Sequence, residues 1–133
     1  MTRPPLLAYY VGAYVPTVRV AVQTLEDLMA IQRLFEQLAS GEVAQQDLVE
    51  AFTWSLDSIR SLILRSAPEG PAKALELREQ SSRGPTFSLT NSYEDWLDCA
   101  YKVDGLISGD SPGHQYLTQE GFDDALVELC YKE

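Results

Sequence analysis

The chain has 133 residues, of which 45% are hydrophobic and 23% are charged. This size and balance predict one folded domain over residues 1–133, and they exclude intrinsic disorder and small folds that depend on disulfides or metals. Twenty acidic residues against ten basic residues give a net charge of −10. We therefore expect neither nucleic acid nor a membrane as a partner, because both are bound through basic surfaces.

The first forty residues predict two strands and a helix. Residues 6–15 are rich in Tyr, Val and Leu, which favour a strand, and valine recurs at every second position of residues 18–22, as in a half-buried strand. A helix is predicted over residues 25–39, because its apolar residues recur at spacings of three and four. Thr24 can cap the start of this helix, and Gly41 suits its end.

The middle of the chain predicts a run of short strands. Residues 42–57 fit neither the helical nor the strand period, so their structure is left open. Residues 59–65, 75–78 and 86–90 have the composition or alternation of strands and are separated by turns rich in Pro, Gly and Ser. The simplest arrangement of these three strands is an antiparallel meander.

The last part of the chain predicts a second helix and two strands. This helix begins after a cap at Asn91 or Ser92 and ends near residues 104–105, where a glycine follows an aspartate. Residues 115–118 and 125–131 then close the chain as strands. The second of these strands is apolar on nearly both faces, which is typical of an interior strand.

Together these elements predict an α+β fold. It would consist of a mainly antiparallel sheet of about five to seven strands, with two or three helices packed on it. The sequence shows no evident internal repeat, low-complexity tract or linker.

The two cysteines, Cys99 and Cys130, lie among apolar neighbours. Small secreted domains that depend on disulfides usually carry four to eight cysteines, so we expect two free, buried thiols in a reducing compartment. The N-terminal sequence does not show the pattern of a secretory signal peptide, and the apolar run of residues 6–15 is too short to span a bilayer. These features favour a cytoplasmic protein of bacterial origin.

Negative charge is concentrated after residue 90. That segment holds half of the acidic residues but only two of the ten basic ones. Acidic surfaces accelerate association with basic proteins, so we expect a partner-binding face here; the alternative is a solvated face that only keeps the protein soluble. The predicted partner-binding residues are Glu94, Asp95, Asp98, Asp110, Asp123 and Asp124.

The only histidine, His114, follows Asp110 closely in the chain. A histidine oriented by a carboxylate can act as a general base, and Ser111 or Cys99 would then be the candidate nucleophile. However, the sequence has no G-x-S-x-G elbow and no cluster of glycines for an oxyanion hole, so no catalytic residue is predicted. One histidine and two separated cysteines do not supply a four-ligand zinc site, and no nucleotide-binding motif is present, so no metal or cofactor is predicted.

In size, charge and fold class, the chain resembles the small acidic α+β proteins that bacteria use as immunity proteins against secreted toxins. This resemblance implies a non-enzymatic module that covers a basic protein surface with acidic residues and a few aromatic anchors. Two alternatives remain open. One is a small hydrolase-like enzyme that uses His114 with a nearby carboxylate, and the other is a structural subunit that forms a homodimer.

Overall fold

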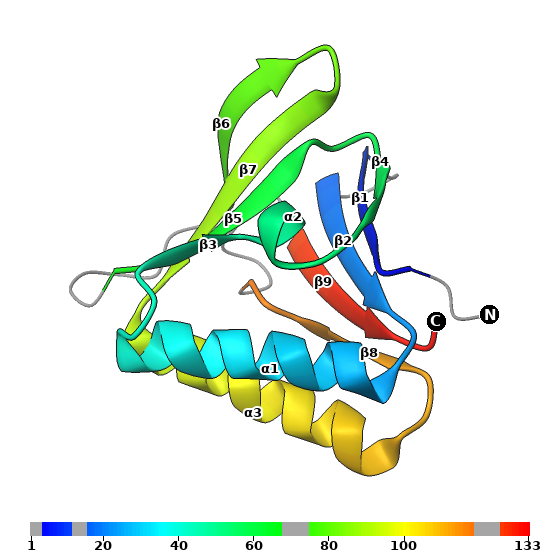
Figure 1. Cartoon of the computed structure of the whole chain (residues 1–133), viewed down its shortest axis with the longest axis vertical. Helices are drawn as coiled ribbons and strands as arrows, with labels where there is room; N and C mark the ends of the chain where they lie inside the picture. Colours follow the sequence, from blue (N-terminus) through cyan, green and yellow to red (C-terminus); the bar gives the residue numbers. More distant parts are fainter. Residues whose placement is uncertain (1–3, 12–15, 68–74, 119–125) are drawn as a thin grey trace.

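The computed structural model describes residues 4–11, 16–67, 75–118 and 126–133. Within these ranges the chain forms nine strands and three helices, and two sheets lie over a pair of long helices (Figure 1). The five-stranded sheet has the order β4-β1-β2-β9-β8, and the four-stranded sheet has the order β3-β5-β7-β6. In chain order the elements are β1 (Leu6–Val11), β2 (Pro16–Val22), α1 (Leu25–Ser40), β3 (Gln45–Asp47), α2 (Leu48–Ala51), β4 (Ser55–Asp57), β5 (Ser61–Ser66), β6 (Leu75–Ser81), β7 (Gly84–Asn91), α3 (Tyr93–Gly109), β8 (Gly113–Tyr116) and β9 (Leu126–Tyr131).

Helix α1 confirms the prediction made for residues 25–39. The Thr24 hydroxyl accepts a hydrogen bond from the backbone N–H of Asp27 at 3.1 Å, which satisfies one of the free donors at the helix start. Gly41 ends the helix in the left-handed conformation, with φ of 80°. The apolar stripe faces the core with five buried side chains, which are Leu28, Ile31, Leu34, Phe35 and Leu38.

Helix α3 is longer than the sequence predicts. Ser92 is its cap, and its hydroxyl accepts from the backbone N–H of Asp95 at 3.1 Å. The predicted end near residues 104–105 is wrong, because Leu106 continues the buried stripe and the helix runs on to Gly109. A single glycine inside a helix costs only about 1 kcal/mol relative to alanine, which the burial of this extra turn offsets.

Residues 42–57, which periodicity left open, form three elements of three or four residues each: β3, α2 and β4. Each element is too short to show a hydrophobic period, which explains why the sequence pattern was unreadable. Asp47 caps α2 by accepting from the backbone N–H of Val49 at 2.9 Å. Strand β4 then pairs with β1 and forms an edge of the five-stranded sheet.

The α+β class is confirmed, but the prediction of one mainly antiparallel sheet of about five to seven strands is wrong. The described strands form two sheets that are both mixed, with parallel pairs β1/β4, β2/β9 and β5/β7. The predicted meander does not form, because β7 lies parallel to β5 and leaves β6 at the sheet edge. Strand β9 lies between β2 and β8, as its apolar faces predicted.

The topology contains an internal repeat. The series β1-β2-α1-β3-β5 and the series β6-β7-α3-β8-β9 follow the same path, which is an antiparallel hairpin, a helix and an antiparallel pair in the opposite sheet. The pairings match as well, since β2 lies parallel to β9 and β7 lies parallel to β5. Apart from β4, which adds a fifth strand at the edge of one sheet, each sheet is therefore built from the hairpin of one half and the last strand pair of the other half.

The register and the sequence agree with this repeat. The segments TLED (residues 24–27) and SYED (residues 92–95) begin the two helices, and LASG (residues 38–41) and LISG (residues 106–109) end them. Beyond these short segments the sequence shows no evident repeat, so the likeness between the halves is mainly one of topology. The buried strand pairs Val18–Val127 and Val20–Leu129 correspond in register to Phe87–Leu62 and Leu89–Leu64.

The two halves share one hydrophobic core, which takes side chains from both sheets and both long helices. At its centre the rings of Phe35 and Trp96 stack at 5.4 Å, which joins α1 to α3. The Trp96 indole N–H donates to the carbonyl of Arg65 at 2.8 Å and so ties α3 to β5. Tyr9 and Phe87 connect the two sheets with ring centroids 4.9 Å apart.

We predict that Phe35→Ala lowers the free energy of unfolding by about 3–5 kcal/mol, because the ring is only 2% exposed and its loss leaves a cavity beside Trp96. Chemical denaturation of the purified protein measures this change. The control is Leu77→Ala on β6, where the side chain is 54% exposed and the expected change is within about 0.5 kcal/mol. A similar small effect at Phe35 would contradict the described core.

Candidate functional site

The acidic residues predicted as one binding face lie in different places. Glu94, Asp95 and Asp98 occupy the first turns of α3, and Glu94 and Asp98 are exposed. Asp110 lies beyond the other end of this helix, about 24 Å away along its axis at 1.5 Å per residue. Residues 123–124 fall outside the described ranges. The four described residues of the predicted set therefore do not all lie together.

Asp110 is engaged within the molecule. Its carboxylate accepts from the Tyr131 hydroxyl at 2.7 Å and from the Lys132 ammonium at 3.0 Å. The hydrogen bond from Tyr131, followed by the bond from Lys132 and its positive charge, holds the pKa of Asp110 below its usual value. This carboxylate connects the end of α3 to the end of β9, which makes it a structural contact.

Acidic residues are instead distributed along both of the long helices. Helices α1 and α3 lie side by side (Figure 1) and together carry seven acidic residues and two basic ones. The sequence argument missed the contribution of α1, because Glu26, Asp27 and Glu36 lie in the part of the chain where charge is nearly balanced. The likeness between residues 24–27 and 92–95 is the signal that could have revealed it.

Apolar side chains are exposed among these acids. Tyr93, Leu97 and Tyr101 are four residues apart on α3 and so share one face of the helix; Tyr101 is 63% exposed. Leu25 and Met29 are exposed at the equivalent positions of α1. Exposed apolar side chains that gather on one surface and are rimmed by polar ones mark interaction sites. We refer to these five residues and the acids of α1 and α3 as the helix-pair face.

The helix pair is held rigidly beneath this face. The Gln32 side chain of α1 donates to the carbonyl of Ala100 at 3.0 Å and to the carboxylate of Asp104 at 2.6 Å on α3. At the other end Tyr93 lies against Gly41, where an added Cβ would be only 2.7 Å from the tyrosine oxygen. Gly41 is thus needed both for its positive φ and for this close approach.

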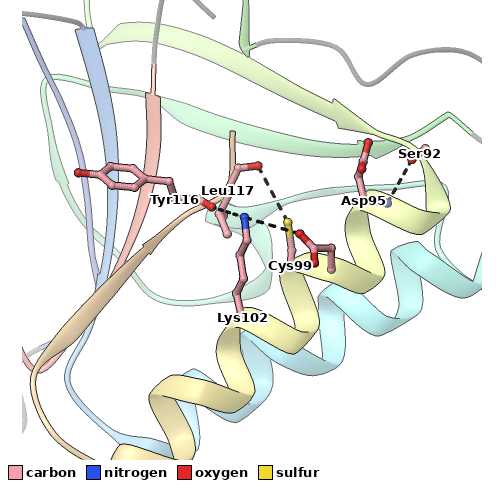
Figure 2. A network of polar contacts seen from close by, with 7 residues as sticks. Ser92, Asp95, Cys99, Lys102, Tyr116 and Leu117 are labelled. Carbon is pink, nitrogen blue, oxygen red and sulfur yellow. Dashed lines mark hydrogen bonds and ion pairs between the residues drawn. The ribbon is translucent and has the colours of Figure 1, made fainter. Parts of the chain in front are cut away.

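The single basic residue of α3 is turned toward the sheet. Figure 2 shows Lys102 donating to the carbonyl of Tyr116 at 2.9 Å and pairing with Asp98 at 3.7 Å. In the same view the Cys99 thiol lies 4.0 Å from the carbonyl of Leu117. These contacts anchor α3 to the chain at and just after β8 and place its only positive charge beside its acids, so the helix stays acidic toward solvent.

Both cysteines are free and buried, as predicted. Burial raises the pKa of the Cys99 thiol to about 12, and burial together with the neighbouring Glu128 carboxylate raises the pKa of Cys130 to about 12. The reactive form of cysteine is the thiolate, so both groups are inert at neutral pH.

We predict that iodoacetamide labels neither thiol rapidly at pH 8 in the native protein and labels both on unfolding, as followed by mass spectrometry. In the folded protein the pKa of each thiol lies above the ordinary value of about 9. As the pH rises, the unfolded chain therefore loses its thiol protons first. The free energy of unfolding should not depend on these thiols below pH 9 and should fall as the pH rises toward 12. Rapid labelling of the native protein would contradict the described burial.

His114 lies on the edge strand β8 with a side chain that is 45% exposed. Its Nδ1 atom is 3.0 Å from a carboxylate oxygen of Glu133, and its ring lies edge-on to Tyr116. The enzyme hypothesis paired His114 with Asp110, but the structure gives the two side chains different partners. Glu128 completes a group whose ligand atoms all lie within 4.8 Å of one another, so these residues could hold a metal ion. The sequence argument missed this group because its members are distant along the chain.

None of the described helices is long and apolar enough to cross a membrane. The chain matches no known protein-family model, and no curated protein or solved structure was found to be similar to it.

Proposed function

We propose that the protein is a non-enzymatic protein-binding module whose helix-pair face binds a basic protein. The observation that carries this proposal is the row of Tyr93, Leu97 and Tyr101, exposed on α3 between acidic residues. Tyrosine is enriched at binding hot spots, because it buries a large apolar area and keeps a polar tip. The helix already fixes the backbone that carries these side chains, so binding has only their rotamers to order.

The charges and the apolar residues have separate roles in this proposal. The acids of α1 and α3 attract a basic surface and raise the association rate, while the aromatic and aliphatic side chains slow dissociation once they are buried. A toxin with a basic active site is a partner of this kind, and an acidic module seated on it would block access to that site. The proposed activity is therefore inhibition by occlusion.

The charge of the helix-pair face also favours a different protein as the partner, and not a second copy of this chain. The two helices have five more acidic than basic residues, and a symmetric dimer through the helix-pair face would bring like charges together. The enzyme alternative is weaker, because within the described ranges no hydrogen bond joins His114 to Ser111 or Cys99, the two candidate nucleophiles. The two free thiols suit the reducing cytoplasm, which is the compartment that we propose for this protein.

To test the proposal, the tagged protein is used to capture a partner from lysates of the source organism, and binding to the identified partner is measured. We expect a protein with a basic surface and an association rate that falls with added salt, which screens exposed charges beyond about 8–10 Å. The Leu97→Ala/Tyr101→Ala variant should lose affinity at least tenfold, since hot-spot truncations cost about 2 kcal/mol or more.

Matched charge variants test whether the acids of the helix-pair face bind a partner or only keep the protein soluble. Glu94→Gln/Asp98→Asn and Glu26→Gln/Asp27→Asn each remove two carboxylates from the helix-pair face, and both should slow association. Glu76→Gln/Glu79→Gln removes two from the exposed strand β6 and should leave the rate near that of the wild type. If all three variants behave alike, or if Tyr101 and Leu97 are dispensable, the proposed face is wrong.

A further inference from the structure

A second feature lies on the outer face of the five-stranded sheet, away from the helices. In the antiparallel pair β8/β9, His114 is opposite Cys130, and Tyr116 is opposite Glu128. Because side chains alternate along a strand, His114 and Glu128 project from the same face, opposite to the buried Val127 and Leu129. Glu133 follows β9 and returns to His114 at 3.0 Å.

We propose that His114, Glu128 and Glu133 form a binding site for a divalent transition-metal ion such as Zn²⁺. Their ligand atoms lie within 4.8 Å of one another. Ligands of a tetrahedral zinc ion, each about 2.1 Å from the metal, are roughly 3.4 Å apart. The His114–Glu133 pair is already near this spacing, and the remaining approach of about an ångström is within the rotational freedom of exposed or half-buried side chains.

The charges at this site also favour a cation. Two carboxylates are held together with one imidazole at this site. Arg19 is the neighbour of Glu128 in the β2/β9 register, yet within the described ranges it forms no ion pair, and its buried Nε atom has no hydrogen-bond partner there. Lys132 is engaged by Asp110. Among the described residues, neither Glu128 nor Glu133 thus forms an ion pair with a lysine or arginine, which leaves both carboxylates available to a divalent ion.

The donor set points to the class of metal. Imidazole nitrogen suits zinc and other transition metals, whereas Mg²⁺ and Ca²⁺ prefer oxygen ligands alone. The Cys130 thiol donates to the Glu128 carboxylate at 2.8 Å, so it orients one of the ligands. Three protein ligands leave a coordination position open to water, and the ion would fasten the last residue of the described chain to the edge strand β8.

Because His114 is the only histidine, its imidazole proton signals report on the site without ambiguity. Untagged protein is titrated with zinc chloride while these signals are followed by NMR and the heat of binding is measured. We expect a saturable change at one equivalent of zinc and no matching change with magnesium. The His114→Gln variant, altered at an exposed position, should bind zinc at least tenfold more weakly, since even groups that only orient metal ligands contribute about 10–100-fold.

The matched variants are Glu128→Gln/Glu133→Gln at the site and Glu94→Gln/Asp98→Asn on α3, which remove the same number of carboxylates. Only the first pair should weaken zinc binding, and a ¹⁵N spectrum of each variant confirms that it is folded. Zinc binding that leaves the His114 signals unchanged, or that is equally strong in all variants, would show non-specific binding to surface acids and overturn the proposal. This result is independent of the partner-capture experiment.

Discussion

The packing of α1 against α3 is the constraint on which the rest of the structure depends. Phe35 stacks on Trp96 at the centre of this contact, and both side chains are almost completely buried. Each helix also connects the two sheets: α1 runs from β2 in one sheet to β3 in the other, and α3 runs from β7 to β8 in the opposite direction. Separating the helices would therefore disturb the core of both halves.

The exchange of strand pairs between the halves has a consequence for function. Because equivalent segments form both helices, the same positions carry acids at each helix start and apolar residues on each exposed face. The internal repeat thus doubles a small surface motif and places its two copies toward opposite ends of the helix pair, because the start of α3 at Tyr93 lies against Gly41 at the end of α1. A face of this kind can present more apolar and acidic area to a partner than either helix alone, without any part of the core being rearranged.

Local signals in the sequence were sufficient for part of the fold. Thr24 and Gly41 bracket α1, the valines of β2 alternate, and β9 is apolar on both faces, so each of these elements was predictable. The pairing of the strands was not predictable, because the parallel contact of β5 with β7 depends on residues far apart in the sequence. Hydrophobic periodicity carries no information about strand order. The last turn of α3 is not predicted from the sequence, because Gly105 locally disfavours a helix even though apolar residues follow it.

The candidate functional sites, too, were only partly predictable from the sequence. Glu94 and Asp98 could be identified from charge alone, whereas the role of Tyr93 and Tyr101 requires knowing which face of α3 is buried. His114 stands out in the sequence as the only histidine, but Asp110, its neighbour in the sequence, is not its partner in space. In the folded protein the carboxylate that contacts His114 belongs to Glu133, nineteen positions further along the chain.

The most direct test of this architecture is native-state hydrogen exchange, followed residue by residue by NMR. If the helix pair binds the two halves into one cooperative unit, the slowest amides of α1, α3, β2 and β7 should all exchange with the same free energy, equal to that of global unfolding measured with denaturant. Exchange of the β7 amides at a clearly lower free energy, while β2 and α1 stay protected, would show that the halves open separately and would contradict this description.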